Sequence, residues 1–198
     1  MQDVRRHYDL LIEENNDPVQ DPPELRRYMD QWDGELFLEA LALDGTQSVL
    51  EIGVGTGRLA LRTAPMSRRF IGIDLSPQTI VRAGENLASF GNVTLMCGDF
   101  LTPAFHDTYD VIYSSLTFMH VAQKEIAIAK LASLLVPGGR MVLSLDKNRA
   151  EIIDYGTRKI RVYPDDPQRI VALMQASGLS IRSTAETAFA YIIAAERR

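Results

Sequence analysis

Val49-Leu50-Glu51-Ile52-Gly53-Val54-Gly55-Thr56-Gly57-Arg58 is the stretch that decides the fold. An apolar β-type run ends in an acid, and three alternating glycines then open a run of helical character. Glycine lets the backbone turn sharply and approach a ligand closely, because no Cβ stands in the way. The helix that follows presents free N–H groups to an anionic or polar ligand group. The pattern is not the dinucleotide-binding G-x-G-x-x-G, since position 58 is arginine.

Outward from this stretch, short β-type runs alternate with helical runs. Strands separated by helices of this length predict βαβ units, a parallel sheet and right-handed crossovers. The last two strands have a very short connection, which requires them to pair antiparallel. The expected strands are 48–52, 70–73, 93–96, 109–113, 140–145, 179–186 and 189–195, and the expected helices between them are 58–65, 77–90, 123–135 and 167–176.

Residues 1–44 are more polar and are expected to form a helical cap that precedes the main domain, residues 45–198. A helix is predicted over 4–16, where apolar residues recur at helical spacing. A second begins at the Pro22-Pro23 pair, since proline is tolerated in a first turn, and a third covers 35–43.

The composition is that of one globular domain. The 198 residues are 46% apolar and 24% charged, which is ample for a hydrophobic core. A net charge of −5 gives no electrostatic footprint for nucleic acid, and no apolar run approaches the roughly 18 residues of a membrane-spanning helix. One cysteine, Cys97, fits a reducing compartment and is expected in the core. We therefore expect a cytoplasmic monomer or homodimer without nucleic-acid or membrane partners.

Acidic residues follow the second and third expected strands. Ligands of such sheets bind at the carboxyl ends of the strands. Asp74 lies 21 residues after Gly53, where a carboxylate can accept both hydrogen bonds of a ribose diol. Asp99 and Phe100 combine an acceptor for an exocyclic amine with a ring that can stack on a purine.

Five segments in this order resemble the motifs of class I S-adenosylmethionine-dependent methyltransferases. They are residues 51–57, Asp74, residues 98–100, residues 110–113 with Leu116 and His120, and residues 135–140. The resemblance covers about residues 46–146. It implies a Rossmann-like three-layer α/β sandwich with a seven-stranded, mostly parallel sheet of order 3-2-1-4-5-7-6, its last strand antiparallel. It also implies S-adenosylmethionine as cofactor and a small-molecule methyl acceptor.

The resemblance assigns roles to the residues of these motifs. The glycines would meet the methionyl part, Asp74 the ribose and Asp99 the adenine amine, with Phe100 or Leu75 beside the ring. Backbone near Ser114 would fix the amino group. Glu51 has two open roles, namely a water-mediated contact to that amino group or a tie to backbone donors of the glycine loop. The implied cofactor-binding residues are Glu51, Gly53, Gly55, Thr56, Gly57, Asp74, Leu75, Asp99, Phe100 and Ser114.

His120 is the candidate catalytic residue, because imidazole suits proton removal at neutral pH. Positioning of the substrate and capping of the following helix are open alternatives. His7 and His106 lie in polar surroundings and are expected at the surface. The three histidines lack a metal-ligand spacing, so no metal is expected.

The cap and the segment after the fifth strand supply candidates for the acceptor side. Tyr8, Tyr28 and Trp32 would close over the sulfonium, where a cation–π contact is favourable, or would pack in the cap. Arg158 lies in the basic run 156–163, which either recognises an anionic substrate or is a solvated edge strand.

These features predict a methyltransferase acting on an oxygen, nitrogen or carbon atom of a small molecule. A nicotinamide-dependent oxidoreductase is a rival interpretation, but Arg58 and the antiparallel final strands argue against it. A non-catalytic protein that binds S-adenosylmethionine, or serves as a partner subunit on the same fold, is the other alternative.

Overall fold

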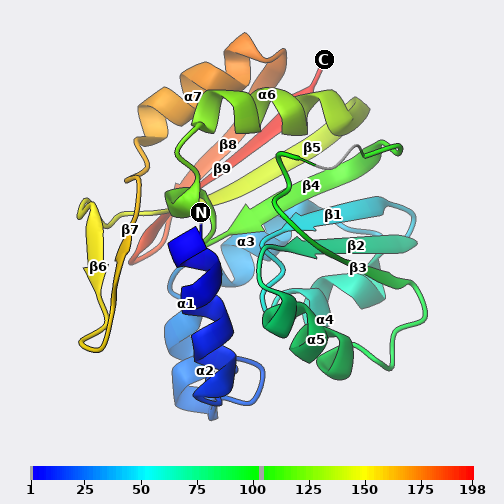
Figure 1. The fold of residues 1–198 in the computed structure, drawn as a ribbon. Coiled ribbons are helices and arrows are strands. Elements are labelled where there is room, and N and C mark those ends of the chain that lie inside the picture. The colour runs from blue at the N-terminus through cyan, green and yellow to red at the C-terminus, as the bar shows by residue number, and fades with distance from the viewer. Residues whose placement is uncertain (1, 103–104) are drawn as a thin grey trace.

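The protein, described as a computed structural model over residues 2–102 and 105–198, is built on one seven-stranded sheet. The sheet order is β3-β2-β1-β4-β5-β9-β8, and β6 pairs with β7 in a separate hairpin (Figure 1). If the hairpin is left out and the seven remaining strands are numbered by their place in the chain, their order across the sheet is 3-2-1-4-5-7-6, as the resemblance implied. The strands are β1 Ser48–Ile52, β2 Arg69–Asp74, β3 Val93–Cys97, β4 Tyr109–Ser115, β5 Leu135–Asp146, β6 Ile152–Asp154, β7 Lys159–Arg161, β8 Leu179–Glu186 and β9 Ala190–Arg197.

Strand directions also agree with the prediction. Strands β1 to β5 pair in parallel, whereas β9 lies antiparallel to both β5 and β8. All five residues of β1 are buried, which is the burial expected of a central parallel strand covered on both faces.

Helices cover both faces of the sheet and make the three predicted layers (Figure 1). Helices α6 (Lys124–Leu134) and α7 (Pro167–Ala176) close one core, which contains Ile128 and Ile170. On the opposite face, α3 (Gly34–Leu41), α4 (Ala60–Thr63) and α5 (Pro77–Asn86) close a second core. Alternate residues of each strand enter one core or the other, since successive side chains of a strand point to opposite faces. Two one-turn helices, η1 (Ala64–Met66) and η2 (Phe118–His120), complete the set.

The N-terminal helices divide between cap and core. Helix α1 (Gln2–Glu13) packs against α5 and β7, and α2 (Pro23–Met29) has no buried residue. Helix α3 packs against β5 and β9 and buries Phe37 and Leu41 completely. The cap that overhangs the strand ends is therefore made by α1, α2 and their connections.

Three expectations for single segments are corrected or refined. His7 is buried rather than at the surface, because the face of α1 that carries it packs on the ring of Tyr155. Cys97 is exposed rather than in the core, because β3 is an edge strand and Cys97 is its last residue. The basic run contains β7, so its backbone pairs with β6. No described helix has the length and apolar character needed to cross a membrane.

Candidate active site

The carboxyl ends of the central strands and the cap enclose a cavity of about 660 Å³. Residues of β1, β2 and their following loops form one end of its wall, and the cap, the segment after β4 and the β6–β7 hairpin form the other. The lining includes Val4, Tyr8, Leu11, Ile12, Tyr28, Met29, Trp32, Glu51, Gly53, Gly55, Thr56, Arg58, Asp74, Leu75, Asp99, Phe100, Ser115, Thr117, Met119, His120, Asp146, Asn148, Ile153 and Tyr155.

The three glycines of the loop after β1 serve different purposes. Gly53 and Gly55 line the cavity with positive φ angles of +74° and +56°. A Cβ on Gly53 would overlap the side chain of Thr117, whereas a Cβ on Gly55 would meet nothing within 4 Å. Gly57 does not line the cavity and packs against Leu87. Gly55 therefore leaves free space where a ligand approaches, and the other two glycines allow close packing.

Asp74 is fixed at the end of β2 by the loops on either side of it. Its Oδ2 accepts a hydrogen bond from the Gly55 backbone N–H at 3.1 Å, and its Oδ1 accepts one from Ser76 N–H at 3.0 Å. Burial raises the pKa of Asp74, while these backbone donors act in the opposite direction. The carboxyl group is thus held rigidly at the cavity wall, with Leu75 beside it.

The residues at the ends of β3 and β4 line the cavity as expected of cofactor-binding residues, with one difference. Asp99 and Phe100 both line the cavity, and Asp99 Oδ1 accepts a bond from Leu101 N–H at 3.0 Å. Ser114 is buried and donates to the Ile52 carbonyl at 2.9 Å. It is the next residue, Ser115, whose atoms reach the cavity.

Glu51 is a buried carboxyl group that keeps its proton at neutral pH. Its Oε2 accepts a hydrogen bond from the Tyr113 hydroxyl at 2.8 Å, and that hydroxyl lies 2.7 Å from Thr63 Oγ1. Burial raises the pKa of Glu51 to about 8, although the bond from Tyr113 and the charge of Arg58 lower it. Its side chain is tied to Tyr113 rather than to backbone donors of the glycine loop.

His120 pairs with Tyr8 across the cavity wall. The Tyr8 hydroxyl lies 2.9 Å from His120 Nε2, and the rings meet edge to face. Burial, followed by the charges of His7 and Lys124, lowers the pKa of His120 to about 4. The imidazole is therefore neutral at physiological pH, and its Nδ1 has no partner among the described residues.

Tyr28 and Trp32 of the cap line the cavity and contact Phe189 in the β8–β9 turn. Their rings meet edge to face at 5.3 Å, and Trp32 packs on Phe189 at 4.6 Å. Ser144, in β5, donates to the Trp32 carbonyl at 2.5 Å. The sequence could not indicate the contacts of Trp32 with Phe189 and Ser144, because they join segments more than 100 residues apart.

Arg158 lies outside the cavity lining and is neutralised. Its guanidinium makes two hydrogen bonds to Glu14, at 2.6 and 2.9 Å, and its Nε donates to His7 Nδ1 at 2.8 Å. The hairpin instead contributes Ile153 and Tyr155 to the wall. Arg158 therefore ties the hairpin to α1.

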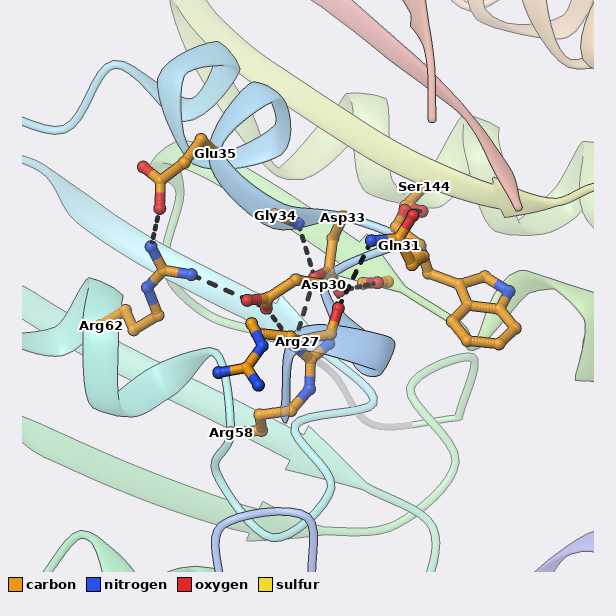
Figure 2. A network of polar contacts seen from close by, with 11 residues as sticks. Arg27, Asp30, Gln31, Asp33, Gly34, Glu35, Arg58, Arg62 and Ser144 are labelled. Carbon is orange, nitrogen blue, oxygen red and sulfur yellow. Dashed lines mark hydrogen bonds and ion pairs between the residues drawn. The ribbon is translucent and has the colours of Figure 1, made fainter. Parts of the chain in front are cut away.

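A buried acid, Asp33, organises the junction of cap and glycine loop (Figure 2). Asp33 is paired with Arg58, whose Nη1 lies 3.1 Å from its Oδ1, and it accepts a 2.7 Å bond from Ser115 Oγ. Arg58 also lies 3.5 Å from Asp30. Arg62 continues the network to Asp30 and to Glu35. No local pattern predicts this network, because its members come from α3, α4, β4 and their connections.

The segments that form the acceptor side of the cavity also contribute residues that the sequence analysis did not select. Asp146 and Asn148 at the end of β5 line the cavity, as do Thr117 and Met119 after β4. The rule that ligands bind at the carboxyl ends of strands would have found Asp146. Among the described residues no group of three or more His, Cys, Asp or Glu side chains is arranged to hold a metal ion.

Comparison with known proteins identifies the class. Residues 49–139 match the family described as "Methyltransferase domain". An uncharacterized methyltransferase of Geobacillus kaustophilus is 30% identical over an alignment of 190 positions that covers 87% of each chain. Another from Anoxybacillus flavithermus is 36% identical over 122 residues, 60% of this chain and 56% of the relative.

Solved structures share the whole architecture. The N-methyltransferase NodS from Bradyrhizobium japonicum, in complex with S-adenosylhomocysteine, superposes with a TM-score of 0.74 at 18% identity over 98% of both chains. Magnesium protoporphyrin IX methyltransferase from Synechocystis with bound S-adenosylmethionine gives 0.76 at 21% identity, covering 98% of this chain and 95% of that one.

The fold, the glycine loop and these relationships define a class I methyltransferase whose cofactor is S-adenosylmethionine. The chain belongs to the methyltransferase family of its Geobacillus relative.

Proposed function

We propose that the protein transfers a methyl group from S-adenosylmethionine to a small-molecule acceptor enclosed under the cap. The observation that carries this proposal is one cavity that includes both the glycine loop and the Tyr8–His120 pair. Its volume of about 660 Å³ lies within the usual range of roughly 300–1,000 Å³ for small-molecule sites. Two structural neighbours are named as an N-methyltransferase and a magnesium protoporphyrin IX methyltransferase, and the second name specifies a small-molecule substrate.

The residues at the strand ends fit this cofactor. Gly55 leaves open space, Thr56 lines the cavity beside it, and Asp74 presents a fixed carboxyl group. We propose that Gly53, Gly55 and Thr56 hold the methionyl part and that Asp74 holds the ribose. Asp99 would then accept from the adenine amine beside Phe100 and Leu75.

The chain contributes mainly binding and alignment. When bound, S-adenosylmethionine supplies a methyl group already activated by a positive sulfur. The cap and the cavity walls would hold the acceptor in line, which can contribute up to roughly 7–11 kcal/mol in ideal cases. His120 is a weak base, because burial disfavours its protonated form and lowers its pKa to about 4. We therefore propose that the Tyr8–His120 pair positions the acceptor by hydrogen bonding.

Calorimetric titration tests the cofactor assignment. We expect micromolar binding of S-adenosylmethionine and S-adenosylhomocysteine and no binding of NADH. Asp74→Ala should abolish that binding with little change in melting temperature, and the exposed Asp107→Ala serves as the matched control. Wild-type affinity in Asp74→Ala would refute the ribose assignment, and binding of NADH alone would favour an oxidoreductase. Binding without turnover on a broad acceptor panel would favour a non-catalytic role.

We propose the cytoplasm as the compartment, because an exposed free thiol such as Cys97 persists in a reducing environment. A monomer or a homodimer is proposed for the oligomeric state. Light scattering after size exclusion distinguishes the two, and a fluorescent fusion expressed from the native gene reports the compartment.

A further inference from the structure

The acceptor end of the cavity is mostly apolar and aromatic. It is formed by the cap, the segment after β4, the end of β5 and the β6–β7 hairpin, and its side chains include Tyr8, Met29, Trp32, Met119, Ile153 and Tyr155. Such walls favour a molecule with an apolar body, because water leaves both surfaces when they meet. They also exclude a strongly charged body, which would lose its hydration here.

Three cations near this end are already paired with carboxylates. Arg58 is paired with Asp33 and Asp30, and Arg158 is bound to Glu14 through two nitrogens. Lys124 forms a buried pair with Asp165, at 2.5 Å. An anionic acceptor would therefore find no available positive charge among these groups, and recognition of an anion by the basic hairpin is disfavoured.

One acid at this end has no such partner. Asp146, the last residue of β5, lines the cavity and accepts a 2.7 Å hydrogen bond from the Asn148 backbone N–H. It forms no ion pair within the described part of the chain, since the adjacent Lys147 turns to Glu186 and the Thr187 carbonyl. The cavity thus carries one uncompensated negative charge on its acceptor side.

We propose that the methyl acceptor is a small amine with an apolar or aromatic body, bound through its ammonium group by Asp146. Trp32 and Tyr8 line the same cavity, and aromatic faces favour a cation. This assignment rests on the proposed function and specifies the substrate class of the same site.

The methyl transfer balances without a buried general base. The ammonium group first loses a proton to solvent, and the freed nitrogen lone pair then forms the new C–N bond. The C–S bond of the donor breaks as this bond forms, and sulfur keeps the electron pair. The N-methylated ammonium product stays cationic, and one proton is released overall. The neutral Tyr8–His120 pair need only hydrogen-bond to the substrate.

Trp32 is the only tryptophan of the chain and lines the cavity, so its fluorescence reports occupancy of the acceptor end directly. We would saturate the protein with S-adenosylhomocysteine and titrate three probes of matched shape at neutral pH, namely phenethylamine, phenethyl alcohol and hydrocinnamate. The amine should bind about tenfold or more tightly than the alcohol, because a hydrogen bond to a charged group is stronger than a neutral one. Hydrocinnamate should bind least.

Two variants assign the preference to one residue. Asp146→Asn should reduce the preference for amine over alcohol to within about threefold, since it keeps the shape and removes the charge. Asp154→Asn, at an exposed ion pair with Lys159 outside the cavity, should retain it. The inference is overturned if phenethylamine binds no more tightly than the other probes, or if Asp146→Asn keeps the full preference. Calorimetry with S-adenosylhomocysteine separates the two failures: lost cofactor binding refutes the proposed function, whereas intact cofactor binding without amine preference refutes only the acceptor class.

Discussion

The hydroxyl oxygen of Tyr8 lies 2.9 Å from Nε2 of His120, although 112 positions separate the two residues. Tyr8→Phe removes that hydroxyl and leaves a buried ring nitrogen without a partner. We expect kcat to fall about tenfold, since a lost neutral hydrogen bond is worth roughly 1–1.5 kcal/mol. The affinity for S-adenosylhomocysteine should change much less.

Steady-state kinetics with an acceptor and calorimetry with S-adenosylhomocysteine check this prediction. Tyr163→Phe, outside the cavity lining, is the matched control and should leave both quantities near wild type. Equal losses of turnover and cofactor affinity in Tyr8→Phe would mean that the hydroxyl supports the cofactor end rather than the acceptor.

Asp33 should be the most sensitive position of the cap. Its buried carboxylate holds Arg58, the Ser115 hydroxyl and the Gly34 backbone N–H. Asp33→Ala leaves a largely buried guanidinium without its main partner, so we expect a loss of roughly 3 kcal/mol in the free energy of unfolding. Urea denaturation measures it.

Glu35→Ala is the comparison for that prediction, because it breaks the exposed pair with Arg62. Such surface pairs contribute about 0–1 kcal/mol. Similar losses in Asp33→Ala and Glu35→Ala would contradict the importance of the buried network.

Glu51 should make stability depend on pH. Its pKa is about 8 in the folded protein against an ordinary value of 4.5, so the folded state holds a proton that the unfolded state releases. The resulting stabilisation is complete below pH 4.5 and is lost as pH rises through 8, by at most about 1.4 kcal/mol per pH unit.

Glu51→Gln removes that dependence and is close in shape. We expect the unfolding free energies of variant and wild type to converge or cross as pH is raised from 5 to 8, in favour of the variant at the upper end. Titrations at several pH values test this. His120 has the opposite sign, because its lowered pKa removes stability below pH 6.5, but that contribution is common to both proteins and cancels. A difference that is constant with pH would show that Glu51 is ionised in the fold.

Two glycines of the same loop should respond differently to alanine. Gly53→Ala places a Cβ into Thr117 and should reduce both stability and cofactor binding. Gly55→Ala meets no protein atom, so it should cost about 1–2 kcal/mol of stability from its positive φ alone. We expect its loss of S-adenosylhomocysteine affinity to exceed that cost, measured by calorimetry beside thermal melting. A Gly55→Ala protein with wild-type affinity would remove this residue from the cofactor site.

The sheet could be predicted from the sequence because the residues that define each strand and its end are neighbours in the chain. The central strands are short apolar runs, and the ends of the first three carry an acid or a glycine. The order and directions of the strands follow from the resemblance and from short connections. The same reasoning found Asp74 and Asp99, which the structure brings to one cavity. Segment ends differed by a few residues, as when β5 begins at Leu135 and includes the Pro-Gly-Gly turn.

The cap could not be predicted in the same way, because its contacts join distant segments. Asp33 precedes a glycine and looks like an ordinary turn, yet its partners are Arg58 and Ser115. His7 looks polar, yet the hairpin covers it. These burials follow from tertiary packing of charged and aromatic side chains, which leaves no periodic signal in the sequence.

Strand β9 lies inside the sheet, between β5 and β8, although it is the last of the seven in the chain. During synthesis β8 emerges before the strand that joins it to the others, so the nascent chain has an unpaired, apolar edge at β5 until residues 190–197 leave the ribosome. Unpaired edges of this kind promote aggregation. Closure of the sheet during synthesis is therefore a late step that requires the last of its seven strands in the chain.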